Sequence, residues 1–147
     1  MSEPLYLFPN WLENDFVSVL TDSFGKITSK CIIVTEERKE HIKQNHEIDY
    51  DFISANLEDT LLNPDLILED CTNDYSLLVI KQFDECGLNV IVRLQISPND
   101  GKYENSVITA FRVGEVSVCR LIKKNNTLII FFCKKIVCHL VNYSISL

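Results

Sequence analysis

The hydrophobic pattern of this chain changes at Asn63-Pro64, and that change constrains the fold more than any other feature. Before it, the segment from about residue 50 to residue 62 carries apolar residues at helical spacing, which are Ile53, Leu57 and Leu61. Proline ends the pattern because it lacks a backbone N–H and restricts the residue before it. After it, short apolar runs alternate with turn residues, which is typical of strands.

The part of the chain after Pro64 is predicted to form an antiparallel meander. Its expected strands are Asp65–Glu69, Ser76–Phe83, Leu88–Ile96, Ser106–Val113 and Ser117–Ile122. The second and third are joined by four residues that end in Gly87, which indicates a hairpin. The apolar tail predicts two more strands, Thr127–Cys133 and Ile136–Val141, joined by lysines. The expected fold is α+β, with N-terminal short helices packed on one face of an antiparallel meander sheet of four or more strands.

The chain has 147 residues, of which 46% are hydrophobic, so it is expected to form one domain. We divide residues 1–147 into an N-terminal arm (1–29), a core (30–113) and C-terminal strands (114–147). The first residues lack the pattern of a signal peptide, and lysines interrupt the apolar tail. A cytoplasmic protein without a membrane span is therefore expected. The sequence does not determine its oligomeric state.

The segment from Thr35 to His46 is a predicted helix with almost no apolar face, since Ile42 is its only hydrophobic residue between those ends. Thr35 suits the N-cap position, and the cation Lys43 suits the C-terminal end of the helix dipole. His41 lies one turn after Arg38, so their side chains are neighbours. Packing does not account for these residues, which indicates either a functional site or a solvated helix.

Cations also stand on three consecutive predicted strands, at Lys81, Arg93 and Arg112. If the strand register brings them together, they form a patch that holds a phosphate. Each of them alone is more simply interpreted as a residue that faces water from a half-exposed strand.

The net charge is −7, and it is unevenly distributed. Residues 47–100 contain twelve acidic and two basic residues, whereas residues 101–147 contain two acidic and seven basic residues. This acidic belt supports a second interpretation, in which the protein is a non-catalytic interaction or immunity-type protein that binds a basic partner.

The six cysteines are interpreted as reduced, mostly buried thiols of a cytosolic protein. A metal site at Cys133, Cys138 and His139 would lack a second cysteine pair to complete four ligands. A thiol nucleophile, Cys119 or Cys133 with His139, is disfavoured because thiols in apolar strands are usually inert. No metal and no cofactor is expected.

Metal-free RNA cleavage needs a base for the 2′-hydroxyl proton, an acid for the leaving 5′-oxygen, and cations around the phosphate. Histidine suits the proton transfers because its ordinary pKa lies near neutrality. Two of the three histidines of this chain, His41 and His46, share one short segment with Arg38, Lys39 and Lys43. These residue types fit an RNase and an anion-binding module equally well.

The order of several segments resembles the phage-type branch of the barnase–EndoU–colicin–RelE superfamily of RNases. The segments that carry the resemblance are Val34-Thr-Glu-Glu-Arg-Lys-Glu-His41-Ile-Lys-Gln-Asn-His46, Leu-Leu-Asn63-Pro64-Asp65 and Val107-Ile-Thr109-Ala-Phe111. The resemblance covers residues 30–113 and implies a short helical region followed by a four-stranded antiparallel sheet. It also implies metal-independent RNA cleavage of the kind carried out by toxins and phage-encoded enzymes, with RNA and an antitoxin or immunity protein as partners.

Eight residues become candidates through this resemblance and the charge pattern. The catalytic candidates are His41, His46, Arg93 and Thr109, and the substrate-binding candidates are Arg38, Lys43, Lys81 and Arg112. Two features depart from the family pattern. Glu47 follows His46 where the family commonly has proline, and strand alternation places Thr109 on an apolar face, which exposes it only if the strand bulges.

Overall fold

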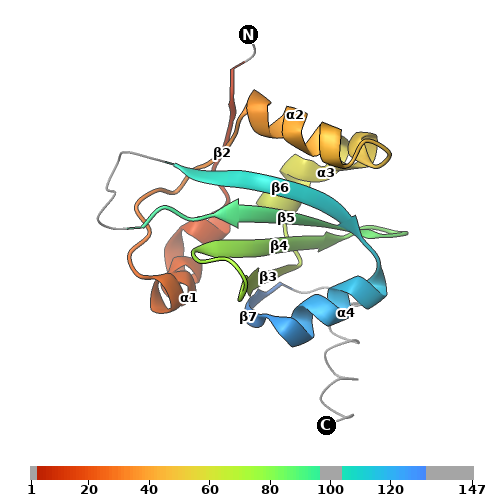
Figure 1. Cartoon of the computed structure of the whole chain (residues 1–147). Coiled ribbons are helices and arrows are strands. Elements are labelled where there is room, and N and C mark those ends of the chain that lie inside the picture. Colours follow the sequence, from red (N-terminus) through yellow and green to blue (C-terminus); the bar gives the residue numbers. More distant parts are fainter. Residues whose placement is uncertain (1–2, 97–103, 132–147) are drawn as a thin grey trace.

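The computed structural model describes residues 3–96 and 104–131, and this part of the chain is an α+β fold (Figure 1). Its helices are the 3-10 helix η1 (Asn10–Leu12), α1 (Asn14–Phe24), α2 (Glu36–Asn45), α3 (Tyr50–Leu62) and α4 (Glu115–Lys124). Its strands are β1 (Leu5–Leu7), β2 (Ile32–Val34), β3 (Leu66–Glu69), β4 (Ser76–Gln82), β5 (Gly87–Arg93), β6 (Asn105–Val113) and β7 (Asn126–Ile130). None of the described helices is long and apolar enough to cross a membrane.

The strands form one sheet in the order β1-β2-β6-β5-β4-β3-β7. β3, β4, β5 and β6 are paired antiparallel in sequence order, which is the predicted meander. β2 is parallel to β6, whereas β1 and β7 join the two edges antiparallel. The sheet is therefore mostly antiparallel, and it extends the expected meander on both sides.

Helices α1 and α3 cover one face of the sheet, which we call the core face, and α2 lies along the β6 edge and contributes Ile42 to the same core (Figure 1). Alternate residues of β4 and β5 point into this core, among them Leu77, Val79 and Val90. Helix α3 contributes Ile53, Leu57 and Leu61, which confirms the helical spacing seen in the sequence. Each is at most 6% exposed, so burial of apolar surface holds α3 on the sheet.

Helix α4 packs on the opposite face and covers only part of it (Figure 1). Val118 of α4 meets Leu68, Leu78 and Ile80 in a second apolar cluster. Beyond this cluster, Arg93 at the end of β5 is exposed. We call the part of this face that lies outside the α4 cluster the open face.

One expectation about secondary structure is wrong. The predicted strand Ser117–Ile122 is part of α4, because Val118, Leu121 and Ile122 follow the helical spacing and pack together on the sheet. The segment 1–29, interpreted as an irregular arm or short elements laid over the core, contains β1, η1 and α1. Strand β7 confirms part of the predicted strand Thr127–Cys133, and the predicted strand Ile136–Val141 lies outside the described residues.

Asn89 lies in the middle of β5, between Ile80 of β4 and Phe111 of β6, and its side chain belongs to the face that α4 covers. It is fully buried, and neither its amide oxygen nor its amide nitrogen has a hydrogen-bond partner. A buried polar group without a partner destabilises the folded state because it gives up its hydrogen bonds to water.

Replacement of Asn89 by leucine, which has a similar volume, is expected to stabilise the protein. The expected gain in the free energy of unfolding is about 1–3 kcal/mol, the usual desolvation penalty of an unsatisfied group. Urea denaturation of Asn89→Leu and wild type measures it. An unchanged or lower midpoint would show that the amide is satisfied in solution.

Candidate functional site

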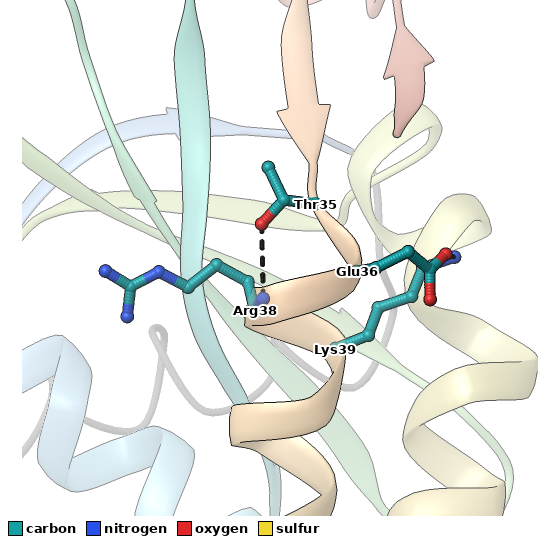
Figure 2. Close-up of polar contacts among 4 residues, drawn as sticks. All are labelled: Thr35, Glu36, Arg38 and Lys39. Atoms are coloured by element: carbon teal, nitrogen blue, oxygen red, sulfur yellow. Dashed lines mark hydrogen bonds and ion pairs between the residues drawn. The ribbon is translucent and has the colours of Figure 1, made fainter. Parts of the chain in front are cut away.

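Helix α2 is fixed at both ends and through a single apolar side chain. The Thr35 hydroxyl accepts a hydrogen bond from the Arg38 backbone N–H at 3.1 Å, which confirms Thr35 as the N-cap (Figure 2). Ile42 is 1% exposed and anchors the helix in the core. At the other end, the His46 backbone N–H donates to the Ile42 carbonyl at 2.8 Å. The remaining side chains of α2 are therefore not buried in the core.

The side chains of α2 leave the helix on two sides (Figure 2). Arg38 extends toward β6, whereas Glu36 and Lys39 lie on the side of α3 and form an ion pair of 3.4 Å. His41 follows Arg38 by three residues, which places it only about 60° around the helix from Arg38. Arg38 and His41 therefore share the side of α2 that borders β6.

Both histidines of the segment have defined neighbours. The exposed His41 ring nitrogen Nε2 lies 3.0 Å from the Asn45 amide nitrogen. The half-buried ring of His46 stacks on Phe111 of β6, with 6.1 Å between ring centroids and 29° between ring planes. This stacking fixes the level of α2 relative to β6.

Helix α2 runs beside β6 in the same direction (Figure 1). His41 precedes His46 by five residues, or about 7.5 Å of helix. Thr109 precedes Phe111 by two residues, or about 6.6 Å of strand. Since His46 stacks on Phe111, His41 lies about level with Thr109.

A bulge places Thr109 on the same face as Arg93. Between Ile91 and Val92 the register of β5 against β6 shifts, so that Thr109 pairs with Ile91 and Val107 pairs with Val92. Val107 and Val92 point into the core, whereas Thr109 is half-buried on the opposite face. The structure therefore contains a bulge of the kind that strand alternation requires if Thr109 is to lie outside the core.

Hydroxyl groups flank Arg93 on both neighbouring strands. Its register partners are Ser76 on β4 and Ser106 on β6, and residues directly opposite each other share a face. Sequence analysis missed both serines, because only the strand register shows that they adjoin an arginine. Within the described residues, neither Arg38 nor Arg93 makes an ion pair with an acidic side chain.

The predicted patch of Lys81, Arg93 and Arg112 is wrong. Lys81 and Arg112 both pair with Leu88, whose side chain is in the core cluster, so they lie on the core face. Arg93 lies at the other end of β5 and on the other face. The register places both of its expected companions out of reach.

The three remaining candidate cations already have partners. The Lys81 ammonium donates to the Asn63 carbonyl at 2.8 Å, and Lys43 lies 5.9 Å from the centre of the Tyr50 ring. Arg112 pairs with Asp49 at 3.5 Å, and the pKa of Arg112 is raised, first by the neighbouring Cys86 and then by Asp49. These contacts give all three residues a structural role.

The described thiols do not form a reactive or metal-binding cluster. Cys31 is buried, and its pKa is raised by desolvation and by the negative charge of Glu104. Cys119 is half-buried, and Cys133, Cys138 and His139 lie outside the described residues. Across residues 3–96 and 104–131, no three His, Cys, Asp or Glu side chains gather in the manner of a metal site.

Comparison of this chain with models of protein families, with curated proteins and with solved structures gives no match. The resemblance to RNases therefore stays a prediction from the segments of this sequence.

Loss of the N-cap is expected to loosen the helix that carries Arg38 and His41. Thr35→Ala removes the acceptor for the Arg38 backbone N–H and is expected to lower the free energy of unfolding by about 1 kcal/mol. Thr35→Ser keeps a capping hydroxyl and is the matched control. Chemical denaturation that shows equal midpoints for the alanine and serine variants would contradict this role of Thr35.

Proposed function

We propose that this protein is a metal-independent endoribonuclease whose site is formed by the open face and the adjacent side of α2. One observation carries the proposal. Arg38 of α2 extends toward β6, and Arg93 of β5 lies opposite Ser106 of β6; neither arginine has an acidic partner in the described structure. Arginine pairs readily with phosphate, and unpaired arginines beside hydroxyl groups suit a phosphodiester.

In the proposed reaction, the ribose 2′-oxygen attacks the neighbouring phosphorus. A new bond forms between the 2′-oxygen and phosphorus, and the bond from phosphorus to the 5′-oxygen breaks. The 2′-hydroxyl proton passes to a base, and an acid protonates the leaving 5′-oxygen. The products are a 2′,3′-cyclic phosphate and a 5′-hydroxyl, and neither an electron carrier nor water is consumed.

The described geometry supports a role for five of the candidates, which are His41, His46, Arg38, Arg93 and Thr109. His41 is exposed at the level of Thr109, as expected of a group that exchanges protons with a substrate. Arg38 and Arg93 neutralise the charge that develops on the phosphate, and Thr109 donates a hydrogen bond to it. The resemblance assigns the second proton transfer to His46, whose ring is held beside β6 by Phe111.

The alternative, an acidic module that binds a basic partner, has less support. Several acids of the belt already have internal partners. Asp49 pairs with Arg112, Asp65 accepts a hydrogen bond from the Gln82 backbone at 2.8 Å, and Asp70 accepts one from the Thr72 backbone at 2.9 Å. The fold explains these three acids, so their presence does not require a basic partner.

Cleavage of RNA in the presence of EDTA tests the proposal. His41→Ala is expected to lower the cleavage rate by about 100- to 10,000-fold, the usual contribution of a general acid or base. Arg93→Gln is expected to lower it by about 100- to 1,000-fold, because it removes charge stabilisation of the transition state. The rate is measured with purified protein and end-labelled RNA.

Lys26→Gln is the charge-matched control, since Lys26 is exposed just after α1. It removes the same charge as Arg93→Gln and is expected to cleave as wild type does. Cleavage that is lost equally in both variants would show a net-charge effect. No cleavage by wild type at high protein concentration, together with salt-sensitive capture of a basic protein, would favour the interaction module instead.

A further inference from the structure

We propose that Tyr75, in the turn that adjoins Arg93, is a stacking platform for a base of single-stranded RNA. This inference rests on the proposed function, because it assigns a subsite to the same surface. It depends on three features of the turn between β3 and β4: the position of Tyr75 beside Arg93, the exposure of its ring, and the rigidity of the turn.

Tyr75 lies next to Arg93 through paired backbone. The Tyr75 carbonyl accepts a hydrogen bond from the Leu94 backbone N–H at 2.8 Å, and Ser76 is the register partner of Arg93. The Tyr75 side chain is nevertheless 45% exposed, so a large part of it remains in contact with water. An exposed aromatic ring one residue from the register partner of an arginine that has no acidic partner among the described residues offers stacking and charge together.

The backbone presents Tyr75 in a conformation that few side chains adopt. Its φ is +57°, in the left-handed region, which costs energy for a residue with a Cβ. Such a residue persists only where the surrounding structure over-determines it, and unusual backbone of this kind is concentrated at functional sites.

Side chains on both sides hold the turn in place. The Asp70 carboxylate accepts hydrogen bonds from the Thr72 and Asn73 backbone N–H groups and from the Asn73 amide. The Asn125 amide oxygen, at the end of α4, accepts one from the Cys71 backbone N–H at 2.9 Å. The turn is therefore tied to α4 and to itself. A pre-ordered ring loses little conformational entropy when a ligand stacks on it.

These features fit single-stranded RNA. Base-on-aromatic stacking is the common device of proteins that bind single strands, and it requires an unpaired base whose face is free. Tyr75 lies two strand spacings from Thr109, or about 10 Å across the sheet. Its backbone partner Leu94 is three residues from Ile91, the partner of Thr109, or about 10 Å along the strand, so the two residues are about 14 Å apart. The base on Tyr75 therefore belongs to a nucleotide near the cleaved phosphate, not to the phosphate itself.

Equilibrium binding of short 2′-O-methyl oligonucleotides tests the subsite, because they lack the attacking hydroxyl and remain intact. One probe carries bases, and an abasic probe carries the same number of phosphates. Tyr75→Ala is expected to weaken binding of the base-bearing probe by about 5- to 100-fold and to leave the abasic probe unaffected. Arg93→Gln is expected to weaken binding of both. Tyr75→Phe keeps the ring and is expected to bind as wild type does.

Tyr6→Ala is the matched control, since Tyr6 is 52% exposed on the edge strand β1. Tyr75→Asn is a second ring-free variant, because asparagine tolerates positive φ and guards against misfolding of Tyr75→Ala. Unchanged binding of the base-bearing probe by both ring-free variants, with Arg93→Gln weakened, would overturn the subsite and leave the RNase proposal standing. Equal loss in Tyr6→Ala would also overturn it. If wild type binds neither probe, both proposals fail.

Discussion

A single buried amide joins the three segments on which the candidate site depends. Asn105, at the start of β6, is fully buried, and its amide nitrogen donates to the Ser29 and Cys31 carbonyls at 2.8 and 3.0 Å. Its amide oxygen accepts from the Gln95 backbone at 2.8 Å. The amide thus fixes the entry to β2, the end of β5 and the start of β6 relative to one another. Because β2 leads directly into α2, the side of α2 that carries Arg38 is placed beside the open face.

The bulge between β5 and β6 then decides which residues that face offers. Without the shift between Ile91 and Val92, strict alternation would place Thr109 in the core with Val107. With it, both valines of this region remain in the core while Thr109 faces the other way. One extra residue therefore reconciles a fully apolar core with a hydroxyl beside Arg93. Bulges are frequent next to active sites, where they change the direction of a side chain.

Local patterns in the sequence predicted local structure well. The spacing of Ile53, Leu57 and Leu61 gave the correct bounds of α3, and Thr35 marked the N-cap of α2. The positions of side chains that depend on strand register could not be predicted from the sequence. No local signal shows that Lys81 shares a face with Arg112 and not with Arg93, because that follows from long-range pairing of strands. Helix α4 was mistaken for a strand because Ser117–Ile122, in which only Ser117 and Arg120 are polar, is too short to distinguish the two periods.

In the proposed function an acidic chain binds a polyanion, and the charge distribution bears on how this can happen. At −7, the whole molecule repels RNA at long range, so attraction must arise close to the surface. Within the described residues, Lys39 and Arg112 form ion pairs with acids, whereas Arg38 and Arg93, like several other described cations, do not. Long-range repulsion is screened by salt, and so is the short-range attraction. The two effects oppose each other, so added salt affects RNA binding less steeply here than in a basic protein with the same phosphate contacts. In the proposed function, selectivity for RNA therefore depends on the geometry of these few residues and not on the overall charge.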